Sequence, residues 1–266
     1  MIFKSSFFLN FAEFFPHFYK DWEPSSYVKK ADYLFRTDGE RHAEPTLLSN
    51  FILGSQDGLV NVLGIVLGVS AATSELRIVF VAALAALGAE SISMGAVAYT
   101  STLARRRHYL KEIEREKSEM KEIPKVEREE VRSIFSKWGY RGDELELMTE
   151  KICKNRKAWL EFMMAHELNL SPVKENEARR SFSVVLLATI FGSIIPILPF
   201  LFTGSIHEGI VASVILSAIT LFVIGYYEAK VTIGSLWRSG LEMLMIGMAA
   251  GIAGYLIGYF VGAVPV

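Results

Sequence analysis

The apolar stretch at residues 47–72 is long enough to cross a lipid bilayer, yet it carries an aspartate near its middle. Its sequence is LLSNFILGSQDGLVNVLGIVLGVSAA, and the acid is Asp57. A charge at this depth is costly, so an intramembrane carboxylate marks a functional site by default. The helical repeat brings small and polar residues onto one face: Asn50, Gly54, Asp57, Asn61, Gly64 and Gly68. We therefore expect a membrane helix whose polar seam faces protein or water instead of lipid.

Apolar residues make up 51% of the 266-residue chain and are concentrated in five runs. Each run is long enough to span a bilayer, and together they cover about 47–72, 78–104, 182–203, 208–229 and 239–262. We predict an all-α polytopic membrane protein with five transmembrane helices and an inserted three-helix cytosolic domain. The expected domains are an N-terminal cytosolic or interfacial segment (1–45), helices one and two (46–104), the charged cytosolic domain (105–180) and helices three to five (181–266).

The positive charges are distributed unevenly along the chain. Of 28 Lys and Arg residues, 19 lie in 105–180 and six precede the first apolar run. Lys and Arg are enriched in the cytosolic loops of membrane proteins. We therefore expect the N-terminus and residues 105–180 to be cytosolic. An odd number of spans then places the C-terminus outside the cell or in a lumen.

Two further features limit the possible chemistry. The aromatic stretch 1–24 lacks a small-residue cleavage site and is interrupted by Pro16, so we expect an interfacial helix on the inner leaflet and not a signal peptide. The single cysteine, Cys153, excludes an internal disulfide and any cysteine-based zinc or iron–sulfur site. The sequence has no Walker-type phosphate loop, which argues against transport driven by ATP hydrolysis. It also has no Glu-x-x-His pair, which argues against a di-iron oxidase of the ferritin type.

The second apolar run carries Glu90 and Met94, which are one helical turn apart on one face. At a rise of about 1.5 Å per residue, Asp57 and Met94 each lie about 15 Å from the cytosolic end of their helix. We expect Asp57, Glu90, Met94 and Asn61 to line a transport pathway. A carboxylate–thioether set favours a transition metal such as Fe²⁺ over Ca²⁺, and buried carboxylates also compete for protons. The alternative for a single methionine is packing, and the alternative for a single acid is capping of, or hydrogen bonding to, a neighbouring helix.

The inserted segment predicts three helices: the continuation of the second run to Pro124, a helix over about 125–140, and a helix over about 143–170 with Asp143 as its N-cap. Paired carboxylates and thioethers on these helices are candidate metal ligands, namely Glu116, Glu119, Glu127, Glu130, Met163, Met164 and Glu167. The alternative for the glutamates is a solvated helix face that forms salt bridges.

These motifs together resemble the vacuolar iron transporter family of ferrous iron transporters. The matching segments are SNFILGSQDGLVNVLGIVLGVSAA, SISMGAVAYTS, FGSIIPILPF and GLEMLMIGMAAGIAGYLIG, with the two ExxE pairs and MMAHE. The resemblance covers about residues 46–262 and implies a homodimer whose first spans line the pathway. It also implies that Asp57 and Met94 are membrane ligands and that the seven acids and methionines above are cytosolic ligands. Ala98 stands where many relatives have a glutamate, and Glu90 is the candidate substitute.

The leading interpretation is a proton-coupled transporter that moves Fe²⁺, or Mn²⁺, Co²⁺ or Zn²⁺, out of the cytosol through a homodimer interface. We expect no enzymatic activity, no prosthetic group and no nucleic-acid partner. The second interpretation is a membrane-anchored metal buffer or sensor that binds metal without moving it. The expected location is the plasma membrane in a prokaryote and the vacuolar membrane in a eukaryote.

Overall fold

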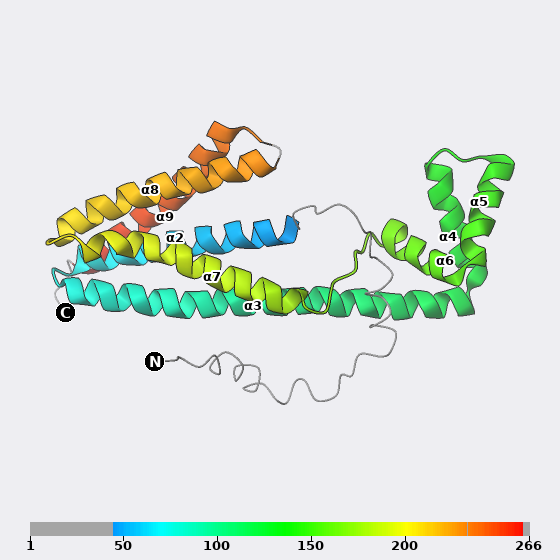
Figure 1. The fold of residues 1–266 in the computed structure, drawn as a ribbon, viewed down its shortest axis with the longest axis horizontal. Helices are drawn as coiled ribbons and strands as arrows, with labels where there is room; N and C mark the ends of the chain where they lie inside the picture. Colours follow the sequence, from blue (N-terminus) through cyan, green and yellow to red (C-terminus); the bar gives the residue numbers. More distant parts are fainter. Residues whose placement is uncertain (1–44, 233, 263–266) are drawn as a thin grey trace, which may run out of the picture. The chain divides into compact units, whose positions relative to one another are not determined.

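The computed structural model describes residues 45–232 and 234–262, so the expected interfacial helix at 1–24 lies outside the described residues (Figure 1). Every regular element in this part of the chain is a helix, which confirms the all-α class. Contacts divide the described residues into two compact units. We call residues 45–108 and 175–262 the membrane unit, and residues 109–174 the inserted unit.

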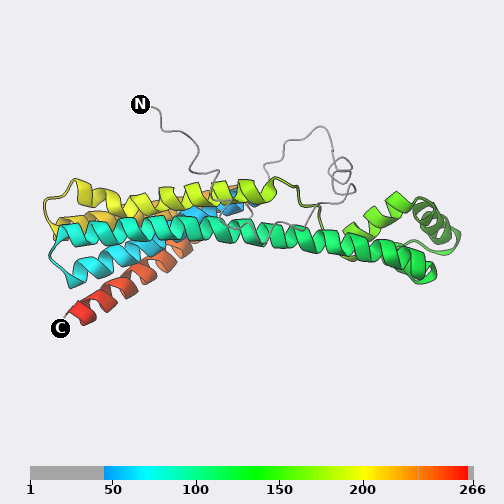
Figure 2. The same cartoon turned by 90° about the horizontal axis from the view of Figure 1, so that it is seen from below.

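Five helices of the described chain are long and apolar enough to cross a membrane, which confirms the predicted number. They are α2 (Pro45–Ala72), α3 (Leu76–Glu122), α7 (Glu177–Ile197), α8 (Ile206–Val231) and α9 (Leu236–Gly262). The second of them, α3, continues without a break to Glu122 (Figure 2). It ends two residues before Pro124, which has no N–H to continue the helical hydrogen-bond pattern.

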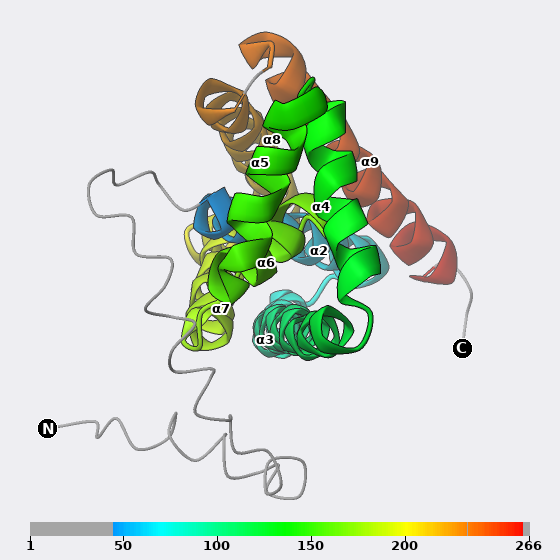
Figure 3. The ribbon, with the colours of Figure 1, turned by 90° about the vertical axis from the view of Figure 1, so that its right-hand side faces the viewer.

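The helix α2 packs mainly against α7 and α9 and lies between them in Figure 3. Its approach to α9 depends on glycine. A Cβ atom added at Gly254 or Gly258 of α9 would collide with the backbone carbonyl of Gly64 or Gly68 on α2. These two glycines of α9 therefore belong to a helix-packing surface.

The contact of α2 with α7 uses the polar residues at the start of the same seam. The Asn50 side chain donates a hydrogen bond of 3.1 Å to the Ser181 hydroxyl of α7. A Cβ atom at Gly54 would lie 2.8 Å from the Val185 carbonyl oxygen of α7. Most of the seam is thus occupied by neighbouring helices, and Asp57 and Asn61 are left for other contacts.

The helix α3 joins the membrane unit through an apolar cluster near its N-terminal end. Val79 and Ala83 of α3 pack there with Val62 and Val66 of α2 and with Ile197 of α7. All five side chains are buried. This cluster fixes the start of α3 beside α2, so that the residues that follow on α3 can reach Asn61.

The inserted unit contains the end of α3, α4 (Pro124–Lys137), α5 (Gly142–Lys154), α6 (Arg156–Phe162) and a π-helix, η2 (Met163–Glu167). The prediction of one helix over 143–170 is wrong. The chain is extended at Asn155, with φ −103° and ψ 102°, and the Asn155 side chain accepts hydrogen bonds from the backbone N–H groups of Lys157 and Ala158. This N-cap starts a new helix and ends the previous one.

The predicted N-cap at Asp143 is also wrong, because α5 begins at Gly142 and Arg141 holds the capping position. Asp143 instead lies in the first turn, where its charge interacts favourably with the helix dipole. The helices of this unit enclose an apolar core that includes Val131, Phe135, Phe162 and Met163. In this unit the end of α3 lies close to the start of α4, and the acidic residues gather between them.

Candidate metal centre and membrane carboxylates

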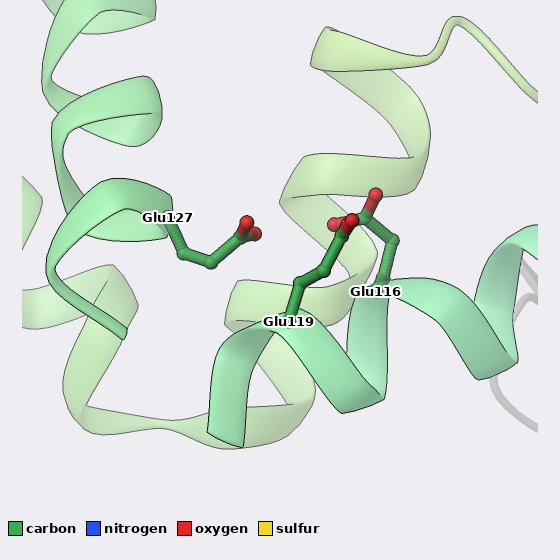
Figure 4. A group of neighbouring side chains, drawn as sticks. All are labelled: Glu116, Glu119 and Glu127. Carbon is green, nitrogen blue, oxygen red and sulfur yellow. The ribbon is translucent and has the colours of Figure 1, made fainter. Parts of the chain in front are cut away.

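Three glutamates of the inserted unit point toward one another across the junction of two helices (Figure 4). Glu116 and Glu119 come from the last turns of α3, and Glu127 comes from the first turn of α4. One carboxylate oxygen of each lies within 4.8 Å of the others. Three hard oxygen ligands at such separations can coordinate a single divalent cation.

Burial makes this cluster different from an ordinary acidic surface. Glu116 is 1% exposed and Glu127 is 2% exposed. One oxygen each of Glu116, Glu127 and Glu167 is buried without a hydrogen-bond donor. A buried carboxylate oxygen without a donor is costly, and a bound cation would remove that cost. The alternative of a solvated glutamate face is therefore wrong for Glu116 and Glu127.

The acids raise one another's affinity for protons. Burial, followed by the negative charge of Glu130, raises the pKa of Glu127 from 4.5 to about 8. Burial and Glu130 likewise raise the pKa of Glu167 to about 7. Near neutral pH these two carboxyl groups therefore hold protons that an incoming metal ion would displace.

Arg115 is the residue of this site that the sequence reasoning missed. Its guanidinium lies 3.0 Å from Glu112, 3.3 Å from Glu116 and 3.7 Å from Glu119, so it neutralises one side of the cluster. The signal was present in the sequence, because Glu112 and Glu119 stand three residues before and four residues after Arg115 on one helix.

The remaining predicted ligands of the inserted unit fall into two groups. Glu130 and Glu167 are near enough to interact with the Glu127 charge, so they border the cluster. Met163 belongs to the apolar core, where its side chain packs against other apolar residues. Met164 is also buried but lines a separate cavity.

The predicted membrane residues are joined by hydrogen bonds between α2 and α3. The Asn61 amide donates to Asp57, one turn earlier on α2, at 3.3 Å, and it also donates to the Glu90 carboxylate of α3. Both amide hydrogens of Asn61 thus serve carboxylates. Met94 is partly buried one turn from Glu90 on α3. The set connected by hydrogen bonds is therefore Asp57, Asn61 and Glu90, without Met94.

The five helices long enough to cross a membrane define a polytopic membrane protein. Its inserted unit carries a buried acidic cluster, and two of its membrane-spanning helices carry a carboxylate pair. The sequence model of the VIT family matches residues 48–259. The chain therefore belongs to the VIT family.

Several characterised proteins resemble the chain over most of its length. Vacuolar iron transporter 1 of Arabidopsis thaliana is 31% identical over 211 residues, which cover 79% of this chain and 84% of that protein. Vacuolar iron transporter 1 of Eucalyptus grandis is 30% identical over 209 residues, with coverage of 79% and 84%. The vacuolar iron transporter of Plasmodium falciparum is 29% identical over 230 residues, with coverage of 83% and 84%.

Proposed function

We propose that this protein carries Fe²⁺ out of the cytosol in exchange for protons. The observation that supports transport most strongly is the Asp57–Asn61–Glu90 set, which connects two membrane-spanning helices by hydrogen bonds. Acids within a bilayer mark ion pathways more often than they serve packing. Relatives that are about 30% identical over most of the chain are named vacuolar iron transporters, which supports iron as the substrate.

The ligand chemistry supports a transition metal as the cargo. The cluster of Glu116, Glu119 and Glu127 offers hard oxygens, and Met94 in the membrane unit and Met164 in the inserted unit offer soft sulfur. Fe²⁺ accepts both kinds of ligand, as do Mn²⁺, Co²⁺ and Zn²⁺ to differing degrees, whereas Ca²⁺ and Mg²⁺ select oxygen. We propose Mn²⁺, Co²⁺ and Zn²⁺ as further substrates.

Proton exchange follows from the same carboxylates. A group that holds a proton near neutral pH, as Glu127 and Glu167 do, must release it when a cation binds. In the membrane, the acids Asp57 and Glu90 would return protons to the cytosol after the metal leaves. The inserted unit and the N-terminus are proposed to face the cytosol, in accord with their excess of Lys and Arg.

A homodimer would cover the membrane acids. Asn61 is exposed in the single chain, and Asp57 and Glu90 are only partly buried, although all three lie in membrane-spanning helices. Polar groups at this depth are too costly to face acyl chains. We propose that a second copy of the chain faces them, so that the pathway lies between two protomers.

A membrane-anchored metal buffer or sensor is the competing function, and the buried acidic cluster alone fits it equally well. Proteoliposomes that contain one dye for Fe²⁺ and one dye for pH separate the two functions. A proton-coupled transporter lets Fe²⁺ in while protons leave, and Glu75→Gln, in the exposed turn before α3, is a control that should not change either flux. A buffer or sensor would bind Fe²⁺ at the outer surface without any signal from inside.

A further inference from the structure

A band of arginines lies where two neighbouring helices leave the apolar part of the membrane unit. These residues follow the apolar run of α3 and occupy the first turn of α7, namely Arg105, Arg106, Arg107, Arg179 and Arg180. Within 105–108 and 175–180 they stand against two acids, Glu175 and Glu177, so the band has an excess of positive charge. None of the five arginines belongs to the metal sites described above.

The helices α3 and α7 lie side by side (Figure 3), and an ion pair joins them at the level of the band. The guanidinium of Arg105 on α3 lies 3.6 Å from the carboxylate of Glu177 on α7. Deeper in the membrane unit, a Cβ atom at Gly95 of α3 would lie 3.1 Å from the Phe182 ring of α7. The end of the apolar run of α3 and the start of α7 therefore lie at one level, so the arginines of both helices form one band.

Two arginines of the band, Arg107 and Arg179, have no anionic partner in the described part of the chain. Both are exposed, and neither forms an ion pair with another described residue. Arg105, in contrast, is paired with Glu177. A guanidinium presents a planar set of N–H donors that fits the oxygens of a phosphate group. The band therefore offers two guanidinium groups to an anion from outside the chain.

An exposed apolar stripe continues from Arg179 along α7. Ser183, Leu187 and Phe191 follow Arg179 at intervals of four residues, and all three are exposed. Leu187 and Phe191 are 63% and 59% exposed. An exposed apolar stripe on a membrane-spanning helix suits lipid tails, and the end of the apolar run is the level of the lipid headgroups. The arginines thus lie where the headgroup of a lipid on this stripe would be.

We propose that Arg107 and Arg179 bind the phosphate-containing headgroups of anionic phospholipids, whose tails lie along the exposed stripe of α7. Positive charge just beyond a membrane helix attracts anionic lipids. Charge and apolar surface also follow each other here in the order in which a phospholipid presents its headgroup and its tails. The proposal depends on the membrane-spanning helices and does not depend on iron transport.

Bound lipid should stabilise the membrane unit. It contacts arginines of two helices, so it should hold α3 against α7. The helix α7 packs in turn against Gly58 of α2, next to Asp57 in the sequence. A ligand that binds only the folded protein raises its melting temperature. Stabilisation by one class of lipid is therefore the effect to measure.

The test uses the full-length protein in detergent micelles that contain dioleoyl phosphatidylglycerol, which is anionic, or dioleoyl phosphatidylcholine, which has no net charge. Native mass spectrometry measures bound lipid, and thermal melting measures stability. Phosphatidylglycerol should raise the melting temperature of the parent by about 2–4 °C above the value in phosphatidylcholine. The double variant Arg107→Gln, Arg179→Gln should bind phosphatidylglycerol about tenfold or more weakly and should lose this rise.

The matched control is the double variant Lys230→Gln, Arg238→Gln, which removes two exposed charges from the turn between α8 and α9. This turn lies on the same side of the membrane unit, because α7 and α8 are consecutive spans, but its two charges have Glu228 and Glu242 close in sequence. The control should keep the preference for phosphatidylglycerol. Arg107→Lys with Arg179→Lys retains both charges and should keep most of the binding.

Three results would overturn the proposal. The first is a parent that binds both lipids alike. The second is an equal loss of binding in the two double Gln variants, which would mean that the lipid responds to total charge and not to the band. The third is the same rise in melting temperature with sodium phosphate and no added lipid, which would mean that the arginines bind a soluble anion. Each of these results leaves the proposed transport function unaffected.

Discussion

Asn61 on α2 donates one amide hydrogen to Glu90 on α3 and the other to Asp57 on its own helix. The hydrogen bond to Glu90 joins two membrane-spanning helices. The amide therefore links the two carboxylates, and we propose that both of them face the passing ion. It also keeps the Glu90 carboxylate beside Asn61 of α2, and we propose that Glu90 serves in place of the acid that is absent at Ala98.

Replacing Asn61 by Ala should slow Fe²⁺ transport by about tenfold, because the two acids lose the group that orients them. Metal binding at the glutamate cluster should not change, since Asn61 belongs to the membrane unit. Initial rates in proteoliposomes and dialysis of the same protein measure the two quantities. The control is Ser93→Ala, an exposed position on α3. An unchanged rate in Asn61→Ala would show that the amide has only a packing role.

Metal binding by the inserted unit should strengthen as pH rises. Glu127 and Glu167, with pKa values of about 8 and about 7, are protonated at pH 6 and must lose their protons to become ligands. Between pH 6 and pH 8.5 the dissociation constant for Mn²⁺ should fall by about tenfold or more. Calorimetry in buffers of different ionisation enthalpy would also count the protons released. A pH-independent affinity would mean that these acids are not ligands.

The stability of the metal-free protein should change with pH in the opposite direction. A carboxyl group whose pKa is raised by folding binds its proton more tightly in the native state than in the unfolded state. The contribution of Glu127 to stability is therefore complete below about pH 4.5 and decreases as pH rises toward 8. Glu127→Gln removes the buried charge and should raise the melting temperature at pH 8 by about 2–4 °C.

The same Glu127→Gln substitution should weaken metal binding, so stability and affinity should move in opposite directions. Thermal melts and calorimetry on one preparation test both effects. The matched control is Glu150→Gln, which is exposed and should change neither quantity. A lower melting temperature in Glu127→Gln would indicate that Glu127 stabilises the fold by a bond that the metal-free structure does not contain.

Arg115 should oppose metal binding, because its guanidinium pairs with the carboxylates of Glu116 and Glu119 and its positive charge repels a cation beside them. We expect Arg115→Gln to bind Mn²⁺ about three- to tenfold more tightly at pH 8.5, where the acids are ionised. The gain is modest because Arg115 is half exposed and its charge is screened by water. Weaker binding in Arg115→Gln would instead show that the arginine holds the acids in a ligating arrangement.

The sequence predicts the membrane part of the fold well for a physical reason. In a bilayer every backbone polar group needs a partner within the helix, so an apolar run of sufficient length has few other structures available. All five expected runs are helices in the structure. The first helix of the inserted segment is also found as predicted, because Pro124 is an unambiguous stop.

The third helix of the inserted segment could not be predicted in the same way. Residues on both sides of Asn155 favour a helix, and only the tertiary packing around Trp159 and Phe162 decides that Asn155 acts as a cap and not as a helical residue. The polar seam of α2 is a similar case. Its spacing predicts a shared face, but it does not say that Gly64 meets α9 while Asn61 meets Glu90.

The sequence predicts the three glutamates of the cluster, but it does not predict Arg115 or the geometry of the site. Spacing identifies Glu116, Glu119 and Glu127, but only the fold brings α4 back against α3 so that the three oxygens converge.

The most direct test of the account compares Fe²⁺ flux and Fe²⁺ binding in one variant, Asp57→Asn, which is nearly isosteric and removes the membrane charge. The account predicts that proteoliposomes with this variant admit Fe²⁺ no faster than empty liposomes, while the glutamate cluster binds metal with the affinity of the parent. Parent-like Fe²⁺ flux in Asp57→Asn would contradict the assignment of the pathway to Asp57, Asn61 and Glu90.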